Sequence, residues 1–449
     1  MRSHGAYTGT GGSAVNKAVA FLVKHPVSGS FFISLSIRTA AAVASNLMID
    51  GVLILDEGQY LLISRLASEG ELTSEFWGGY GRSLFDSTRA FTWPLTALFW
   101  LFGPHRILGQ LLSATFGAIS AAAAASLASR FLRPRFALAA GLTVAIFPSQ
   151  ILWSSVVLRE SMIWALLATM ALVIAYSQSC VSAGRILLSA VMAGVLFGGI
   201  VWLRPHTALV AIWCLYPAVL LGSNRVVRVA TATCLLVVVP WLAGFGPGGA
   251  ELAIAASGRL GISRSYMSFA ADSAIVESNI GSTALSCDKR PDANTQAVLT
   301  PLIDRTASDW VCIYDYSGNV VLVDNRLRTS VKHLSQGLLD ALVRPLPWEA
   351  YSSAAAFLAG LESILWVLLY GLAIIGVWIH RRSHRLFLFP TLLVVVISMT
   401  GAMSHGNLGT AFRHRGQLLY ALAVLAVGGV QGLVDARAAT RLAAVVDTQ

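Results

Sequence analysis

The sequence predicts an all-α polytopic membrane protein that carries a small α+β insertion on its outer face. Of its 449 residues, 56% are hydrophobic and only 12% are charged, whereas soluble proteins carry roughly 25% charged residues. Mean hydropathy is +0.68. Apolar runs recur along the chain at about the 20 residues that a helix needs to cross a bilayer. These features exclude a soluble enzyme, a disordered tail and a fibrous protein.

The hydropathy pattern predicts about ten spanning helices and no cleavable signal peptide. The expected spans are centred in 33–55, 107–129, 136–152, 161–177, 186–203, 207–222, 229–246, 355–379, 386–402 and 417–434.

Basic residues gather in alternate loops and predict the topology. They lie in the N-terminal tail, after the second span, before the fifth, seventh and ninth spans, and after the last: Arg2, Lys17, Lys24, Arg130, Arg133, Arg135, Arg185, Arg225, Arg228, Arg381, Arg382, Arg385, Arg437 and Arg441. The positive-inside rule makes this side cytoplasmic. We therefore expect an inner (cytoplasmic) membrane protein with both termini inside, and any active site facing the periplasm or cell exterior.

The expected outer segments divide the chain into three parts. Residues 1–246 form an N-terminal transmembrane module whose first outer loop, 56–106, contains two helices that lie along the membrane surface. Residues 247–350 hold eleven of the 22 acidic residues and read as a small outer domain with a β-hairpin over 310–324. Residues 351–449 supply the C-terminal transmembrane helices. A disulfide between Cys287 and Cys312 is expected in an oxidising compartment, and two unpaired thiols are the alternative.

Three outer carboxylates are candidate catalytic groups. Asp56 and Glu57 directly follow the first predicted span, and Glu160 lies at the outer mouth between the third and fourth spans. Adjacent acids at a helix end are often only solvated caps. Charged residues at a membrane boundary are costly unless they are used, so a base that deprotonates an acceptor hydroxyl or amine is the sharper interpretation.

Cationic side chains on the same side are candidate ligands of a phosphate. They are Arg159, Arg204, His206, Arg413 and Arg415, with Tyr60, His405 and His414 as further substrate contacts. Arg159 could instead pair with Glu160 at a helix start, and Arg204-Pro205-His206 could be a polar turn. The positive-inside rule does not explain the basic triplet at 413–415, because this triplet lies on the predicted outer side. Arg413 and Arg415 together could chelate a phosphate or diphosphate.

Motifs for metals and nucleotides are absent from the sequence. It contains no HExxH, paired CxxC or EF-hand pattern and no phosphate-binding glycine loop. No cofactor is therefore certain, although Asp56 and Glu57 could ligate a divalent cation. No nucleic-acid partner is expected. Arg38, near the first span, is expected to extend to the inner surface, whereas Asp50 and Glu362 receive no role.

The first third of the chain resembles the membrane glycosyltransferases of the C superfamily, in particular the protein O-mannosyltransferase and aminoarabinose-transferase-like group. The resemblance rests on an ordered series over about residues 40–180: Asp56-Glu57-Gly58-Gln59-Tyr60, Thr92-Trp93-Pro94, Trp100-Leu101-Phe102-Gly103, Phe147-Pro148 and Ser154 to Glu160. It implies that Asp56 is the base or positions the acceptor, and that Glu160 is the second outer acid. It also implies a polyprenyl-phosphate sugar donor, basic residues that bind its phosphate, and inversion in one displacement.

The chain departs from that group in two ways that keep alternatives open. Its bulky outer segment lies between the seventh and eighth spans, and the 407–415 ending looks more like some polysaccharide polymerases. A polyprenyl-diphosphate-dependent polymerase or ligase with a histidine base, His206, His405 or His414, is the nearest rival. A transporter or flippase would show repeated halves, and we see none. A non-catalytic assembly subunit is the remaining alternative.

Overall fold

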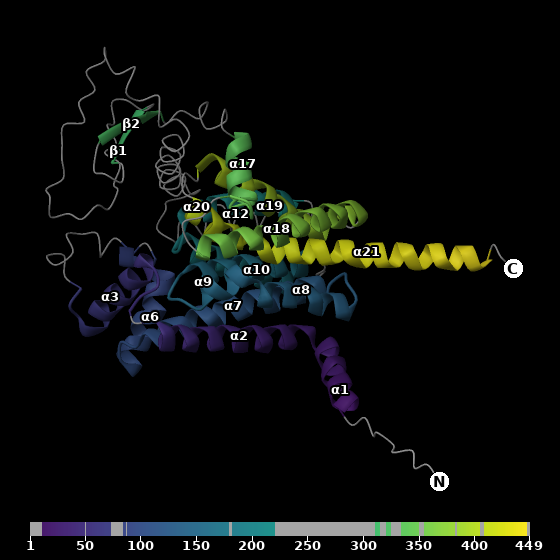
Figure 1. The fold of residues 1–449 in the computed structure, drawn as a ribbon, viewed down its shortest axis with the longest axis horizontal. Coiled ribbons are helices and arrows are strands. Elements are labelled where there is room, and N and C mark those ends of the chain that lie inside the picture. Colours follow the sequence, from purple (N-terminus) through teal and green to yellow (C-terminus); the bar gives the residue numbers. More distant parts are fainter. Residues whose placement is uncertain are drawn as a thin grey trace, which may run out of the picture.

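The structure, a computed structural model, is described here for residues 11–49, 51–72, 84–86, 88–178, 182–220, 310–314, 320–324, 334–349, 354–381, 384–404 and 408–446. These residues are mostly helical (Figure 1). The N-terminal elements are α1 (Gly11–Lys24), α2 (Pro26–Met48), α3 (Leu55–Glu69), α6 (Arg89–Phe102), α7 (Arg106–Ala128), α8 (Pro134–Ile146), α9 (Pro148–Ser154), α10 (Glu160–Gln178), α11 (Ala183–Val201) and α12 (Pro205–Leu220). The C-terminal elements are β1 (Trp310–Tyr314), β2 (Val320–Asp324), α17 (Leu334–Leu342), α18 (Ala354–Ile379), α19 (His384–Ser404), α20 (Leu408–Arg415), the 3-10 turn η4 (Gly416–Leu418) and α21 (Leu419–Val446).

Five of the described helices are long and apolar enough to cross a membrane, which supports a membrane protein. They span Pro26–Met48, Arg106–Ala128, Glu160–Gln178, Phe357–Ile379 and Ala411–Arg441. The bent pair α8–α9 makes a sixth if it is counted as one span, and α11 and α19 contain shorter apolar stretches, Leu187–Val201 and Leu388–Ala402. The expected count of about ten is therefore not reached within the described residues, and the span predicted at 229–246 lies outside them.

Two predicted spans differ from the observed helices. The first was expected at 33–55, but α2 begins at Pro26 and ends at Met48. Proline suits a first helical position, and Gly51, with φ of 94°, turns the chain before α3 begins. The span predicted at 136–152 is broken into α8 and α9, which are bent by 57° at Phe147–Pro148, because proline cannot donate the hydrogen bond that would continue the helix.

The helix break is held by two buried charges from other helices. The missing N–H of Pro148 frees the carbonyl of Val144, which accepts from Arg38 Nη2 at 3.1 Å, and Arg38 Nη1 also reaches the carbonyl of Ala145 at 2.8 Å. On the other side of the break, the backbone N–H of Ser149 donates to Glu362 Oε2 at 2.8 Å. A cation thus caps the C-terminus of α8 and an anion caps the N-terminus of α9, as the helix dipoles favour.

The position of Arg38 corrects the expectation that this side chain extends to the inner surface. Arg38 is fully buried and its Nε also donates to Ser154 Oγ at 2.7 Å. Gly117 on α7 makes the space, because a Cβ there would lie 2.5 Å from Arg38 Nε. The Ala-rich face of α7 packs closely against α2, α8 and α10, as small residues allow in membrane bundles.

Basic residues of two predicted cytoplasmic segments lie far along the helices from the candidate catalytic acids. α1 and the last turns of α21 lie at one end of the bundle, whereas α3 and α6 lie at the other (Figure 1). At the terminal end, Arg133 pairs with Asp435 at 2.8 Å and Arg130 stacks on Tyr176 of α10. α7 runs from there to Arg106, which contacts the first acidic loop. Arg130 and Arg133 therefore lie at the opposite end of the bundle from the candidate catalytic acids, which have arginines of their own beside them.

The predicted β-hairpin is present. β1 and β2 pair antiparallel, with Cys312 opposite Leu322. Most of the predicted 247–350 insertion lies outside the described residues, as do Cys287 and the side chain of Cys312, so the expected disulfide and the wider α+β domain remain predictions. α17, which ends the same segment, packs against α19 and α20.

Replacing Arg38 tests the capped break. In Arg38→Ala, the carbonyls of Val144 and Ala145 are buried without a donor, so we expect the free energy of unfolding to fall by about 3 kcal/mol or more. The measurement is thermal unfolding of the purified protein in detergent. Arg437→Ala, at an exposed position on α21, is the matched control. An Arg38→Ala unfolding temperature equal to that of the control would contradict this role.

Candidate functional site

The adjacent acids of α3 enter two different environments. Successive residues of a helix point about 100° apart, so Asp56 and Glu57 diverge from the first turn of α3. The Asp56 side chain is 41% exposed and pairs with Arg413, whereas the Glu57 side chain is fully buried. One acid of the pair is thus open to a substrate and the other is not.

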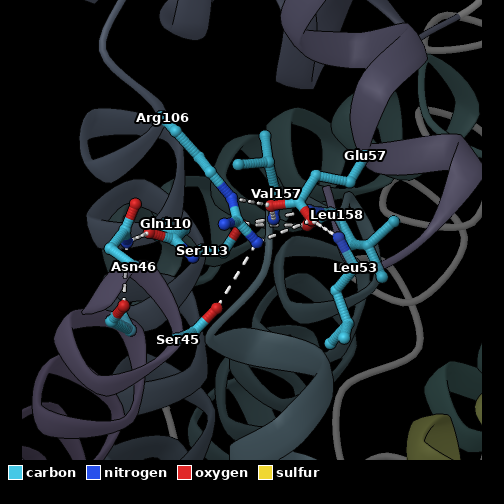
Figure 2. A network of polar contacts seen from close by, with 10 residues as sticks. Ser45, Asn46, Leu53, Glu57, Arg106, Gln110, Ser113, Val157 and Leu158 are labelled. Atoms are coloured by element: carbon cyan, nitrogen blue, oxygen red, sulfur yellow. Dashed lines mark hydrogen bonds and ion pairs between the residues drawn. The ribbon is translucent and has the colours of Figure 1, made fainter. Parts of the chain in front are cut away.

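Glu57 joins three segments of the chain (Figure 2). Arg106, at the start of α7, grips its carboxylate with both Nε and Nη2, at 2.9 and 3.1 Å. The backbone N–H of Leu53 donates to Oε2 at 3.0 Å, and that of Val157 donates to Oε1 at 3.3 Å. Both carboxylate oxygens are therefore occupied, which favours a positioning role for Glu57 over the catalytic role suggested by its sequence.

Further polar contacts, shown in Figure 2, join the 155–159 loop to α7 and join α7 to α2. Ser113 of α7 donates to the carbonyl of Leu158 at 3.1 Å, and Asn46 of α2 donates to Gln110 of α7. The bonds from Ser113 to Leu158 and from Val157 to Glu57 fix the 155–159 loop, which leads directly into Glu160. The sequence analysis missed Arg106. The feature that could have pointed to it is a basic residue at the start of a predicted span, directly after the acid-rich outer loop.

Glu160 and Arg413 form the centre of the site. Glu160 Oε1 lies 2.8 Å from Arg204 Nη2 and 3.3 Å from Arg413 Nε. Arg413 Nη1 in turn lies 2.6 Å from Asp56 Oδ2. Arg413 therefore bridges carboxylates of α3 and α10, although it lies 357 positions from Asp56 in the sequence. The structure brings together four of the residues that the sequence nominated.

Arg159 and Tyr60 border this cluster. Arg159 Nη1 donates to the carbonyl of Leu203 at 2.7 Å, which ties it to the turn that holds Arg204. Tyr60 is 5% exposed and packs edge-on against Phe91 with ring centroids 5.4 Å apart. Burial raises the pKa of the Tyr60 hydroxyl, and the positive charge of Arg159 opposes that shift. Tyr60 thus stays protonated beneath the carboxylates and can act only as a neutral donor or acceptor.

The cluster has unused hydrogen-bonding capacity. Arg204 Nε and Nη1 and Glu160 Oε2 are buried and have no hydrogen-bond partner among the described residues, although both side chains are only 2% exposed. Buried polar atoms of this kind call for a partner. Three guanidinium groups (Arg159, Arg204, Arg413) face two carboxylates (Asp56, Glu160), so the site carries a surplus positive charge. An anion, such as a phosphate, fits both features.

Arg415 serves a different structure. Its Nε donates to the carbonyl of Ala341 at 2.9 Å and its Nη2 to that of Arg344 at 2.5 Å. Its guanidinium also stacks over Trp366 at 5.5 Å. Arg415 therefore anchors the end of α17, and the structure does not bring it together with Arg413 as a chelating pair.

The other residues that the sequence singled out lie outside the described part of the chain or elsewhere on the described helices. His405, Asp50 and the side chain of His206 lie outside the described residues, and His414 lies on α20 beside Arg413. Glu362, which received no role from the sequence, caps α9. Within the described ranges, no group of three or more His, Cys, Asp or Glu could hold a metal ion, so a divalent cation stays a prediction.

Fold and site together define a helical membrane protein with an ionic, anion-compatible site at one end of its bundle. The chain matches no protein-family model and shows no significant similarity to a curated protein. The functional argument therefore depends on the site itself.

Removing Arg106 tests the positioning role of Glu57. Arg106→Leu leaves a buried carboxylate without its cation, so we expect a loss of about 3–5 kcal/mol in stability, read from thermal unfolding in detergent. Removing the charge as well, in Glu57→Gln/Arg106→Leu, should recover part of the loss.

Arg65→Leu is the matched control for Arg106→Leu. Arg65 also pairs with a glutamate at 2.9 Å, but in an exposed pair on α3, which is worth only about 0–1 kcal/mol. Equal effects at positions 65 and 106 would show that the Glu57 contacts do not hold the site together.

Proposed function

We propose that this protein is an integral membrane glycosyltransferase that moves a sugar from a polyprenyl-phosphate donor to a cell-envelope glycan, lipid or protein. One observation carries the proposal. An accessible carboxylate, Asp56, shares Arg413 with a buried guanidinium cluster in which two nitrogens of Arg204, Nε and Nη1, have no partner among the described residues. Such a site offers a base and an anion-binding group side by side at the end of a membrane bundle.

The proposed reaction is a single inverting displacement. Asp56 accepts the proton of the acceptor hydroxyl or amine, whose freed electron pair attacks the anomeric carbon. The bond from that carbon to the phosphate oxygen breaks, and the polyprenyl phosphate leaves with the electron pair. Arg204 and Arg413 stabilise the negative charge that develops on the leaving oxygen. Asp56 becomes neutral when it takes the proton, and that proton is later lost to solvent.

Glu160 and Arg413, at the centre of the site, have different roles in this proposal. Glu160 is 2% exposed and lies between two arginines, so we propose that it holds Arg204 and Arg413 in place and is not the base. Arg413 pairs with Asp56 at 2.6 Å. A donor phosphate that engages Arg413 would loosen this pair and free Asp56 to act as a base, which links base activation to donor binding.

The proposal includes the finer topology expected from the sequence. About ten spans, with the shorter helices α11, α12 and α19 and the segment 229–246 counted among them, would place both termini in the cytoplasm. Asp56 and Glu160 would then face the periplasm or cell exterior of an inner membrane, where lipid-linked sugars are used by the family that the chain resembles. The α+β insertion would lie on the same side as these acids.

Replacing Asp56 tests the base. In Asp56→Asn, turnover of a radiolabelled polyprenyl-phosphate sugar should fall by about 10²–10⁴-fold, measured as release of polyprenyl phosphate from a panel of donors. Glu69→Gln, on the exposed end of the same helix, should keep its turnover.

The polymerase or ligase alternative predicts a different pattern. There, Asp56→Asn would stay active, alanine at one of His206, His405 or His414 would abolish activity, and transfer would require an oligosaccharide linked to polyprenyl diphosphate. That outcome would overturn the proposed base and donor class together.

Replacing Arg204 tests the phosphate contact. Arg204→Gln removes the charged donors, so kcat/KM for the donor should fall by about ten- to a hundredfold, the equivalent of one charged hydrogen bond or more. Because Glu160 would then lose a partner, the double variant Glu160→Gln/Arg204→Gln serves as the control for folding. It should regain stability without regaining activity, and recovery of both would contradict a direct role for Arg204.

A further inference from the structure

The first described helix stands apart from the bundle. α1 meets α2 at His25–Pro26 and lies at the end of the bundle opposite α3 and α6 (Figure 1). The last turn of α1 packs against the bundle. Its Leu22 lies against Gly29 of α2, and Leu138 of α8 approaches the same glycine. The body of α1 is therefore not covered by the described part of the protein.

The exposed body of α1 is amphipathic. Val15 and Val19 are 64% and 52% exposed, and they lie one turn apart on one side of the helix. Lys17 and Lys24 lie two turns apart on the opposite side and are also exposed. Phe21, 62% exposed, lies one turn after Lys17, at the edge of the lysine side. The exposed apolar side chains fit a partner that is itself apolar.

The charge on α1 has no carboxylate to balance it. Residues 1–49 contain no Asp or Glu, and within the described ranges neither Lys17 nor Lys24 forms an ion pair. Arg135, exposed in the first turn of α8, adds positive charge to the helix that contacts α1. The face around α1 therefore suits an anionic partner.

We propose that α1 lies on the bilayer surface and binds anionic phospholipid head groups through Lys17 and Lys24. Two features select a bilayer over another protein. α1 continues directly from a membrane-crossing helix, α2, so it emerges at the level of the head groups. It also combines an apolar side that can enter the acyl boundary with lysines that can reach phosphate. This inference depends on the membrane fold and not on the proposed enzymatic activity.

Hydrogen–deuterium exchange of the full-length protein in lipid nanodiscs tests this surface. Nanodiscs of phosphatidylcholine alone are compared with nanodiscs that contain phosphatidylglycerol. We expect amides of residues 15–24 to exchange at least tenfold more slowly with the anionic lipid, since each lysine shifts the docking equilibrium roughly fivefold. About 1 M salt, which shortens the screening length to about 3 Å, should remove the difference.

Variants separate the lysines from general charge effects. Lys17→Gln/Lys24→Gln should lose the dependence on anionic lipid, whereas Arg437→Gln/Arg441→Gln, which removes the same charge from exposed positions on α21, should keep it. Equally fast exchange in both lipids would overturn the proposal. Equally slow exchange in both would mean that a second copy or another part of the chain covers α1, and would also overturn it.

Discussion

The structure depends on the hydrogen bonds that the free backbone groups make at the break between α8 and α9, in an interior that excludes water. Pro148 ends α8 and leaves carbonyls on one side and an N–H on the other. In a low-dielectric interior such groups must find partners. Arg38 and Glu362 supply them from α2 and α18. Two buried charges that look anomalous in apolar helices therefore join the N-terminal module to the C-terminal helices at one point.

The break also sets the position of the ionic site. It redirects the chain into α9 and the 155–159 loop, where Val157 meets Glu57 and where Glu160 begins α10. Glu57 then holds the lead-in to α3, so that Asp56 faces Arg413. The buried contacts thus fix a carboxylate that remains open to solvent. A site assembled on rigid helix ends in this way keeps its charges in place without a ligand.

Sequence patterns predicted what depends on local composition. The positions of most apolar helices, the two helices α3 and α6 of the acidic loop, and the hairpin follow from periodicity and from the cost of charge in lipid. The pattern could not separate Asp56 from Glu57, because their difference arises from Arg106 and Val157, which are remote in sequence. It likewise could not show that Arg413 meets Asp56 while Arg415 turns away, or that Arg38 serves a helix break and not the membrane surface.

The short helix α20 has one further consequence. Arg413 and Arg415 are two positions apart, so their side chains leave α20 on nearly opposite sides. One is bonded to the site carboxylates, and the other to carbonyls in the last turn of α17 and just after it. α20 therefore ties the end of α17, through Arg415, to Asp56 and Glu160, through Arg413. In so short a helix the two arginines cannot be repositioned independently, so the placement of α17 and the placement of Arg413 constrain each other.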